Sequence, residues 1–203
     1  MIWLGHDMSC LNPRSNPRPT VNAMSKFDPT IHHRKSIRLR GYDYTQAGAY
    51  FVTMVTYQRD CLFGEIKDGE MTLSDLGVIA DECWRGIPAH FPFVELGAHV
   101  VMPNHVHGMI VIHDNGGGAI YRAPTVERFG KPTVGSLPTI IRTYKAAVTR
   151  TIGRQHNATA IWQRNYYEHI IRTDREMDGI WRYIEANPVH WEDDEENRPA
   201  ARR

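Results

Sequence analysis

The chain has 203 residues, of which 41% are hydrophobic and 23% charged, and its formal net charge is +1. These values are ordinary for a globular protein, and the length suits one domain with a sizeable core. No apolar run reaches the length of a membrane span, the N-terminus lacks a signal peptide, and the three scattered cysteines contain no CxxC pair. We therefore expect a cytoplasmic protein with neither a membrane association nor a thiolate zinc site.

The two ends of the chain differ in charge from the centre. Residues 1–40 hold seven basic and two acidic residues, are rich in Pro, Asn and His, and show no helical or alternating period. They are predicted to form a flexible basic arm. Met24 is a candidate for the natural start, in which case residues 1–23 are an upstream extension. Residues 192–203, with five acids before three arginines, are expected to be a charged tail.

The first expected elements are a strand and a hairpin, and the ordered region begins near Tyr42. The segment AYFVTMVTY (49–57) is β-branched and aromatic, which is typical of a central strand. The segment CLFGEIKDGEMTL (61–73) predicts a hairpin, because Asp68-Gly69 suits the turn between two short strands.

A helix and two further strands follow the hairpin. Ser74 is expected to cap a helix that extends to about Arg85, with apolar residues at helical spacing. Two apolar segments, 92–102 and 105–112, are separated only by the turn residues Pro-Asn, which predicts an antiparallel pair. The Gly- and Pro-rich segment 113–135 is expected to be a loop.

The last third of the chain predicts a helix, a strand and a final helix. Ser136 begins a segment with an apolar stripe at helical spacing, and Gly153 is expected to end it. The segment NYYEHIIR (165–172) is predicted to be a strand. Asp174 is expected to cap the last helix, which ends at Asn187 because the next residue is proline.

The order of these elements predicts an α+β fold. Without the small hairpin and the final helix, the order is βαββαβ, which is the ferredoxin-like pattern. In that pattern an antiparallel sheet is covered by helices on one face. We expect one domain of this kind over residues 41–191.

Two histidines in VMPNHVHGMIVI (101–112) indicate where chemistry could take place. Side chains of a strand alternate between its faces, so His105 and His107 point the same way. Buried imidazoles need hydrogen-bond partners, and a pair side by side is well suited to binding a metal. A His-x-His pair alone is also compatible with a structural or surface role.

The final helix presents a phenol and an amide on one flank. Its apolar stripe consists of Met177, Ile180, Trp181 and Ile184. Tyr183 lies to one side of this stripe, and Asn187 follows four residues later on the same flank. From the spacing alone, Tyr183 could equally be a half-buried tyrosine at the edge of the helix.

Three segments together resemble a known family. MPNHVHGMIVI, WQRNYYEHIIR and YIEANPV occur in the order and at the separations found in tyrosine HUH transposases of the small single-tyrosine type. The similarity is greatest to REP-associated tyrosine transposases and covers residues 34–191. It implies the ferredoxin-like fold and a metal-dependent endonuclease and strand transferase that acts in DNA transposition and recombination. The implied reaction forms a 5′-phosphotyrosine intermediate.

The resemblance also implies a role for individual residues. His105 and His107 would bind Mg²⁺ or Mn²⁺, Asn187 would complete the metal site, and Tyr183 would be the nucleophile. Tyr166 and Tyr167 are alternatives, because they belong to the family-like segment NYYEH. They lie on a predicted strand, however, and no amide residue follows either of them at helical spacing.

The implied substrate is single-stranded DNA with hairpin or palindromic ends, processed by a monomer or a homodimer. Basic residues are candidates for contacts with its backbone. They are Arg34, Lys35, Arg38, Arg40, Arg142, Lys145, Arg164 and Arg172. A solvated helix face is the alternative for Arg142 and Lys145, and an ion pair with Glu168 or Asp174 for Arg164 and Arg172.

Two other functions are compatible with some of these residues. His-x-His on a strand also occurs in amidohydrolases, but their (β/α)₈ barrel needs about 250 residues and another order of elements. A domesticated relative that binds DNA hairpins without cleaving them is the second alternative. The presence of both histidines, Tyr183 and Asn187 favours the enzyme.

Overall fold

The computed structural model describes residue 39 and residues 42–114, 133–156 and 160–197. The chain forms two compact units, 1–39 and 40–203, and the fold described below belongs to the second. Four basic residues predicted to contact DNA lie outside the described residues, namely Arg34, Lys35, Arg38 and Arg40.

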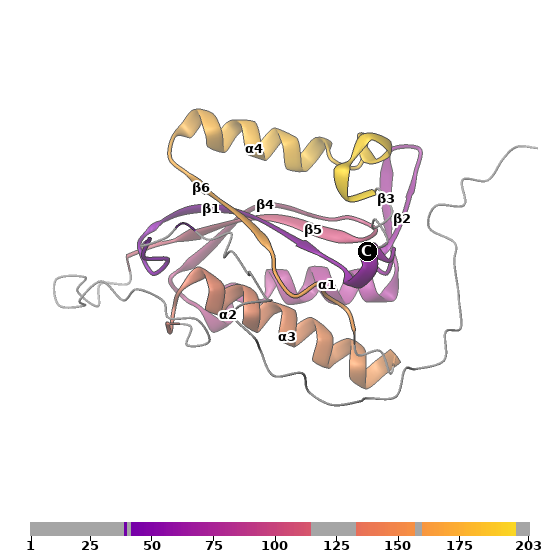
Figure 1. Ribbon diagram of the computed structural model, residues 1–203, viewed down its shortest axis with the longest axis horizontal. Helices are drawn as coiled ribbons and strands as arrows, with labels where there is room; N and C mark the ends of the chain where they lie inside the picture. Colours follow the sequence, from indigo (N-terminus) through magenta and orange to yellow (C-terminus); the bar gives the residue numbers. More distant parts are fainter. Residues whose placement is uncertain (1–38, 40–41, 115–132, 157–159, 198–203) are drawn as a thin grey trace, which may run out of the picture. The chain divides into compact units, whose positions relative to one another are not determined.

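Four antiparallel strands form the central sheet in the spatial order β4-β5-β1-β6 (Figure 1). These strands are β1 (Gly48–Val55), β4 (Val94–Val101), β5 (His105–Ile112) and β6 (Tyr167–Ile171). The two central strands, β1 and β5, pair with each other, and β6 and β4 form the edges. This strand order is that of the ferredoxin-like βαββαβ sheet, so the fold class expected from the sequence is confirmed.

A separate hairpin consists of β2 (Gly64–Lys67) and β3 (Glu70–Leu73). Its two turn residues have positive φ angles, 53° at Asp68 and 77° at Gly69. A type I′ turn requires this backbone conformation at both central positions, and Asp-Gly is a favoured sequence for it. The predicted hairpin and its turn are therefore confirmed.

Helices cover both faces of the sheet. Helices α1 (Asp75–Arg85), α2 (Ile87–His90) and α3 (Leu137–His156) lie on one face, and α4 (Asp174–Ala186) lies on the opposite face (Figure 1). Among the described residues, no helix has the length and apolar character that crossing a membrane would require.

Three helix ends test the predicted capping residues. The Ser74 side chain accepts a hydrogen bond from a backbone N–H of α1, as expected. Helix α3 continues beyond Gly153 to His156, because one interior glycine costs only about 1 kcal/mol and Ile152, directly before it, is still buried. The cap of α4 is Thr173 rather than Asp174. Thr173 has an extended backbone and its Oγ1 accepts an N–H of the first turn, where Asp174 lies.

Alternation along the central strands separates two cores. On β1, Tyr50, Val52 and Met54 pack in the large core beneath α1 and α3, whereas Ala49 and Phe51 pack in a smaller core with α4. On β5, Met109 belongs to the smaller core. His105 and His107 share its parity and therefore face α4.

Gly108 lies between the two cores, where the Trp84 ring packs directly on β5. A Cβ at Gly108 would come within 2.2 Å of this ring, whereas a Cβ at Gly179 of α4 would have no atom within 4 Å. We expect Gly108→Ala to lower the free energy of unfolding by about 1–3 kcal/mol through overpacking. Gly179→Ala, the control, should raise it by about 0.5–1 kcal/mol because alanine favours helix. Urea denaturation of both variants measures these changes, and equal stabilities would contradict this packing.

The C-terminal segment folds back over the sheet after α4. It contains two 3₁₀ turns, η2 (Trp191–Asp193) and η3 (Glu195–Asn197), and the Trp191 side chain is buried. Arg59, which follows β1, binds this segment: one guanidinium nitrogen donates to the Glu195 carbonyl at 2.6 Å, and another lies 3.0 Å from a Glu196 carboxylate oxygen. The start of the region expected to be a charged tail is thus part of the folded unit.

Candidate active site

The two histidines of β5 form a buried pair on the face of α4. His105 is 0% exposed and His107 3%, and their ring centroids are 4.4 Å apart. Burial lowers the pKa of His105 to about 3, and burial together with the neighbouring His105 lowers the pKa of His107 well below its ordinary value. Both imidazoles are therefore neutral at neutral pH, which is the state that binds a metal.

Asn104 determines which nitrogen of His105 carries the proton. The Asn104 amide nitrogen donates to the carbonyls of Glu196 at 2.7 Å and Arg59 at 3.3 Å, so its oxygen faces His105 Nδ1 at 2.9 Å. An amide oxygen can only accept, so Nδ1 carries the proton and Nε2 has a free lone pair. Nε2 is buried without a hydrogen-bond partner among the described residues.

Asn187, at the C-cap of α4, contributes a second unpaired acceptor. Its side chain is 3% exposed, and within the described chain its Oδ1 has no hydrogen-bond partner. It is close enough to His105 to oppose the lowering of that residue's pKa. Two acceptors cannot satisfy each other, and a buried polar atom without a partner is costly. A cation bound between them would satisfy both.

Asp194 adds a carboxylate to this group, and the sequence analysis missed it. One ligand atom each from His105, His107 and Asp194 lie within 4.8 Å of one another. The Asp194 side chain is 6% exposed, and its Oδ2 is 3.9 Å from His105 Nε2. The signal available in the sequence was Trp191, a large apolar residue in a charged segment.

The ligand atoms fit a divalent cation that accepts both nitrogen and oxygen ligands. Two imidazole nitrogens and a carboxylate oxygen lie together, and the carboxamide of Asn187 is close to His105. Mg²⁺ prefers oxygen ligands, whereas Mn²⁺ accepts imidazole more readily. The residues present therefore fit a divalent cation such as the resemblance implied.

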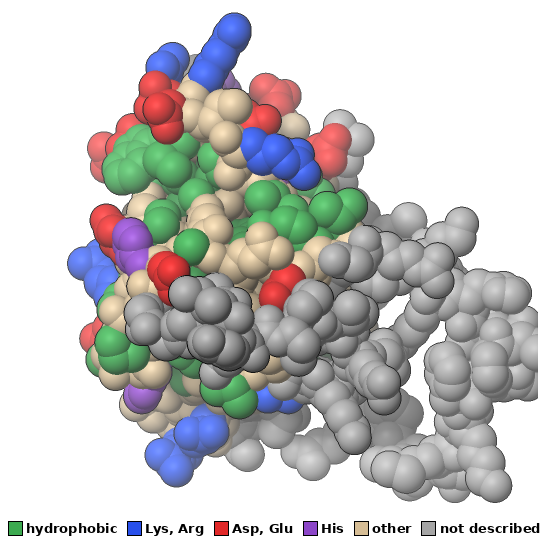
Figure 2. Space-filling model, turned by 90° about the vertical axis from the view of Figure 1, so that its left-hand side faces the viewer, with side chains coloured by type: hydrophobic (Ala, Val, Ile, Leu, Met, Phe, Trp, Pro, Cys, Tyr) green, Lys and Arg blue, Asp and Glu red, His purple; other side chains and the backbone are tan. Residues whose placement is uncertain are grey.

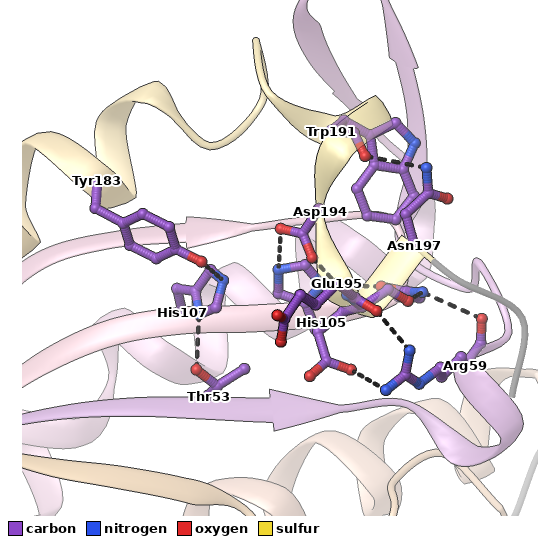
Figure 3. Close-up of polar contacts among 11 residues, drawn as sticks. Thr53, Arg59, His105, His107, Tyr183, Trp191, Asp194, Glu195 and Asn197 are labelled. Carbon is purple, nitrogen blue, oxygen red and sulfur yellow. Dashed lines mark hydrogen bonds and ion pairs between the residues drawn. The ribbon is translucent and has the colours of Figure 1, made fainter.

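Tyr183 lies directly beside the histidine pair (Figure 3). Its hydroxyl is 3.4 Å from His107 Nε2, and the other nitrogen of that ring is 2.8 Å from Thr53 Oγ1. Phe51 stacks on His107 and contacts the Tyr183 ring edge-on, which orients both. Tyr183 is nevertheless 48% exposed, so a large substrate can reach its hydroxyl.

The carboxylates nearby keep Tyr183 protonated. Burial raises the pKa of Tyr183, and the charges of Asp194, Glu196 and Glu195 raise it further, whereas Asn187 lowers it. A positive charge at the histidine pair would offset these carboxylates and favour the phenolate.

The structure thus brings together the four residues predicted as one site: Tyr183, His105, His107 and Asn187. The alternative tyrosines lie elsewhere. Tyr167 is on β6 with its ring edge-on to Phe51, and Tyr166 packs against the large core on the other side of the sheet. In the part of the chain that is described, no ring contact or hydrogen bond joins Tyr167 to either histidine.

The basic residues predicted to contact DNA differ in burial and in hydrogen bonding. Lys145 donates to the carbonyls of Gln163 at 2.7 Å and Asn165 at 2.9 Å, and burial lowers its pKa to about 8. These contacts give Lys145 a structural role between α3 and the segment before β6. Three exposed arginines remain candidates for DNA contacts, namely Arg142, Arg164 and Arg172. Among the described residues, none of them forms an ion pair with Glu168 or Asp174.

Comparison with known proteins shows what the chain is similar to. No protein-family model matches the chain. An uncharacterized protein of Haemophilus influenzae is 41% identical over 177 residues, which cover 84% of this chain and 97% of that protein. A second protein of Haemophilus influenzae, named as a REP-associated tyrosine transposase, is 27% identical over 148 residues, covering 72% of this chain and 73% of that protein.

A solved structure shares the fold. The structure of a REP-associated tyrosine transposase bound to a REP hairpin matches with a TM-score of 0.55 at 20% identity, over 78% of this chain and 74% of the other. Sequence similarity, fold and the three sequence segments agree. The chain is similar in sequence to a protein named as a REP-associated tyrosine transposase and shares the fold of a solved one.

Proposed function

We propose that the protein is a metal-dependent endonuclease and strand transferase that cleaves single-stranded DNA at hairpin-containing sites through a 5′-phosphotyrosine intermediate. The similarity to REP-associated tyrosine transposases supports a role in DNA binding and processing. The observation that carries the finer proposal is the position of the Tyr183 hydroxyl, 3.4 Å from one of two buried histidines with unpaired acceptors around them.

The proposed reaction is the one that the resemblance implies, with Tyr183 as the nucleophile. Tyr183 Oη attacks the scissile phosphorus, the bond from phosphorus to the 3′ oxygen breaks, and the 5′ phosphate stays on the tyrosine. The phenol loses one proton and the departing 3′ oxygen gains one, so the step is balanced. The 3′ hydroxyl can later reverse it, which conserves the energy of the phosphodiester bond.

The metal site would be formed by His105, His107, Asn187 and Asp194. When bound, Mg²⁺ or Mn²⁺ would polarise the scissile phosphate and offset the charge that develops on it. Asn104 holds His105 with its free nitrogen toward this site, and Thr53 orients the His107 ring through a hydrogen bond with Nδ1.

Hairpin DNA is the proposed substrate. The structurally similar transposase is bound to a REP hairpin, and we propose that this chain binds hairpin DNA as well. Arg164 and Arg172 flank β6, the strand that leads into the helix of Tyr183, and Arg142 is exposed on α3. These arginines and the arm residues would contact the phosphate backbone.

A non-cleaving hairpin-binding module is the second candidate. One observation favours it. His105 is fully buried beside Trp191 and Asp194, so a substrate does not reach its ring in this structure. The similarity to REP-associated tyrosine transposases is compatible with this function too, since DNA binding and cleavage can use different residues.

A cleavage assay separates the two candidates. End-labelled single-stranded hairpins from the DNA flanking the protein's own gene would be incubated with Mn²⁺, Mg²⁺ or EDTA and run on a denaturing gel. We expect cleavage with Mn²⁺, less with Mg²⁺ and none with EDTA. Tight hairpin binding without cleavage under all three conditions would reject the enzyme in favour of the binding module.

A further inference from the structure

A second site lies one helical turn from Tyr183. An open pocket of about 360 Å³ is lined by Phe51, Tyr167, His169, Glu176, Gly179 and Ile180. It lies between β6 and the first turns of α4, on the same face of the sheet as the histidine pair. Figure 2 views the molecule from this end, where charged side chains crowd the top and hydrophobic side chains are exposed below them.

We propose that this pocket binds one unpaired nucleobase of the DNA, next to the scissile phosphate, and so contributes to the choice of cleavage site. This inference rests on the proposed function. Helical residues four positions apart lie on the same flank, about one turn or 5.4 Å from each other. Gly179 in the pocket and Tyr183 at the cleavage site have this relation, so one strand can reach both.

Aromatic rings connect the pocket to the catalytic tyrosine. Phe51 lines the pocket, and its ring lies 6.3 Å from that of Tyr167 and 6.0 Å from that of Tyr183. Tyr167 is 55% exposed, which leaves a face of its ring free for stacking. Proteins hold single-stranded nucleic acids by stacking bases on such rings, at about 1–3 kcal/mol per base.

Polar atoms at the rim match the edge of a base. Glu176 accepts a hydrogen bond from the Arg172 backbone N–H at 2.8 Å through Oε2, and His169 Nε2 lies 3.9 Å from the same oxygen. A carboxylate held in this way is an acceptor for an exocyclic amino group. The pocket should therefore prefer adenine, cytosine or guanine to thymine.

Gly179 makes the proposal testable without loss of the fold. A Cβ at this position would meet no atom within 4 Å, and leucine is a good helix former, so Gly179→Leu fills the pocket and leaves the helix intact. Asp178→Leu is the matched control, because it places the same side chain at the neighbouring, exposed position of α4, which does not line the pocket.

The experiment combines these variants with abasic DNA. Single nucleotides on either side of the scissile phosphate would be replaced by abasic sites, and cleavage rates would be measured with Mn²⁺. For one position we expect the abasic change to slow the wild-type protein about 5- to 150-fold, the equivalent of the stacking energy. Gly179→Leu should slow cleavage of intact DNA similarly and show no further loss with that abasic site, whereas Asp178→Leu should behave as wild type.

The possible failures are distinguishable. Two results would overturn the pocket proposal and leave the proposed function intact. The first is a Gly179→Leu variant that cleaves intact DNA as fast as the wild type. The second is an abasic site that slows the Gly179→Leu variant by the same factor as it slows the wild type. If the wild type does not cleave, the proposed function fails, and binding still tests the pocket. Stacking should quench 2-aminopurine fluorescence at one position of a bound hairpin, and Gly179→Leu should abolish that quenching. Equal quenching with both proteins would overturn the inference.

Discussion

Tyr183→Phe is expected to abolish the covalent protein–DNA adduct and to lower the cleavage rate by about 10⁴-fold or more, as for other enzymes that lose their nucleophile. The substitution removes only the hydroxyl, whose contact with His107 is long at 3.4 Å. The free energy of unfolding should therefore change by less than about 1 kcal/mol. Hairpin affinity should be unchanged, because Phe preserves the ring against Phe51. A denaturing gel and a hairpin titration measure both quantities.

The matched control for this variant is Tyr167→Phe. It removes a hydroxyl from the other exposed tyrosine on the same face of the sheet but keeps the ring that lines the pocket. Its cleavage rate should stay close to that of the wild type. If Tyr167→Phe lost the adduct while Tyr183→Phe kept it, the nucleophile would be on β6 and the proposed site would be wrong.

Removing the amide of Asn187 is expected to separate metal binding from folding. Asn187→Leu keeps the approximate shape of the side chain but deletes a buried oxygen that has no hydrogen-bond partner among the described residues. Without metal, the variant should therefore be more stable than the wild type by about 1 kcal/mol. With Mn²⁺ at about 100 times its dissociation constant, the wild type should gain about 2.7 kcal/mol, and the variant should gain much less.

Cleavage should follow metal binding. We expect Asn187→Leu to slow it by about 10²–10⁴-fold, since charge stabilisation at a phosphate contributes several kcal/mol. His113→Ala, which removes an exposed histidine one residue beyond β5, is the control and should keep the Mn²⁺ response. Thermal denaturation with and without Mn²⁺ measures the effect on stability. A full Mn²⁺ response in Asn187→Leu would exclude this residue as a ligand.

The fold could be predicted from local patterns because they agree with the tertiary structure. The alternation in β1, the Asp68-Gly69 turn and the Ser74 cap each act within a few residues, and each is found as expected. The shared direction of His105 and His107 also follows from the period of a strand. Capping at Thr173 was missed because Asp174, an equally good capping residue, follows it directly.

The rest of the site depends on contacts between distant parts of the chain. The proton position on His105 is determined by Asn104, which is held by carbonyls 45 and 92 residues away. Asp194 reaches the histidines because Arg59, Asn104 and the buried Trp191 hold the C-terminal turns. The spacing of apolar residues along the sequence does not indicate such contacts. Likewise, nothing in the sequence indicated that the Lys145 ammonium, predicted to contact DNA, donates to two backbone carbonyls.

The central claim is that Tyr183 forms the covalent bond to DNA, and peptide mass spectrometry after the cleavage reaction tests it most directly. Trypsin cleaves after Arg164, Arg172 and Arg182, so Tyr166 and Tyr167 share the peptide 165–172 while Tyr183 lies in a different one. With hairpin DNA and Mn²⁺, we predict a nucleotide-bearing peptide that contains Tyr183. A nucleotide on the peptide 165–172 would contradict the account.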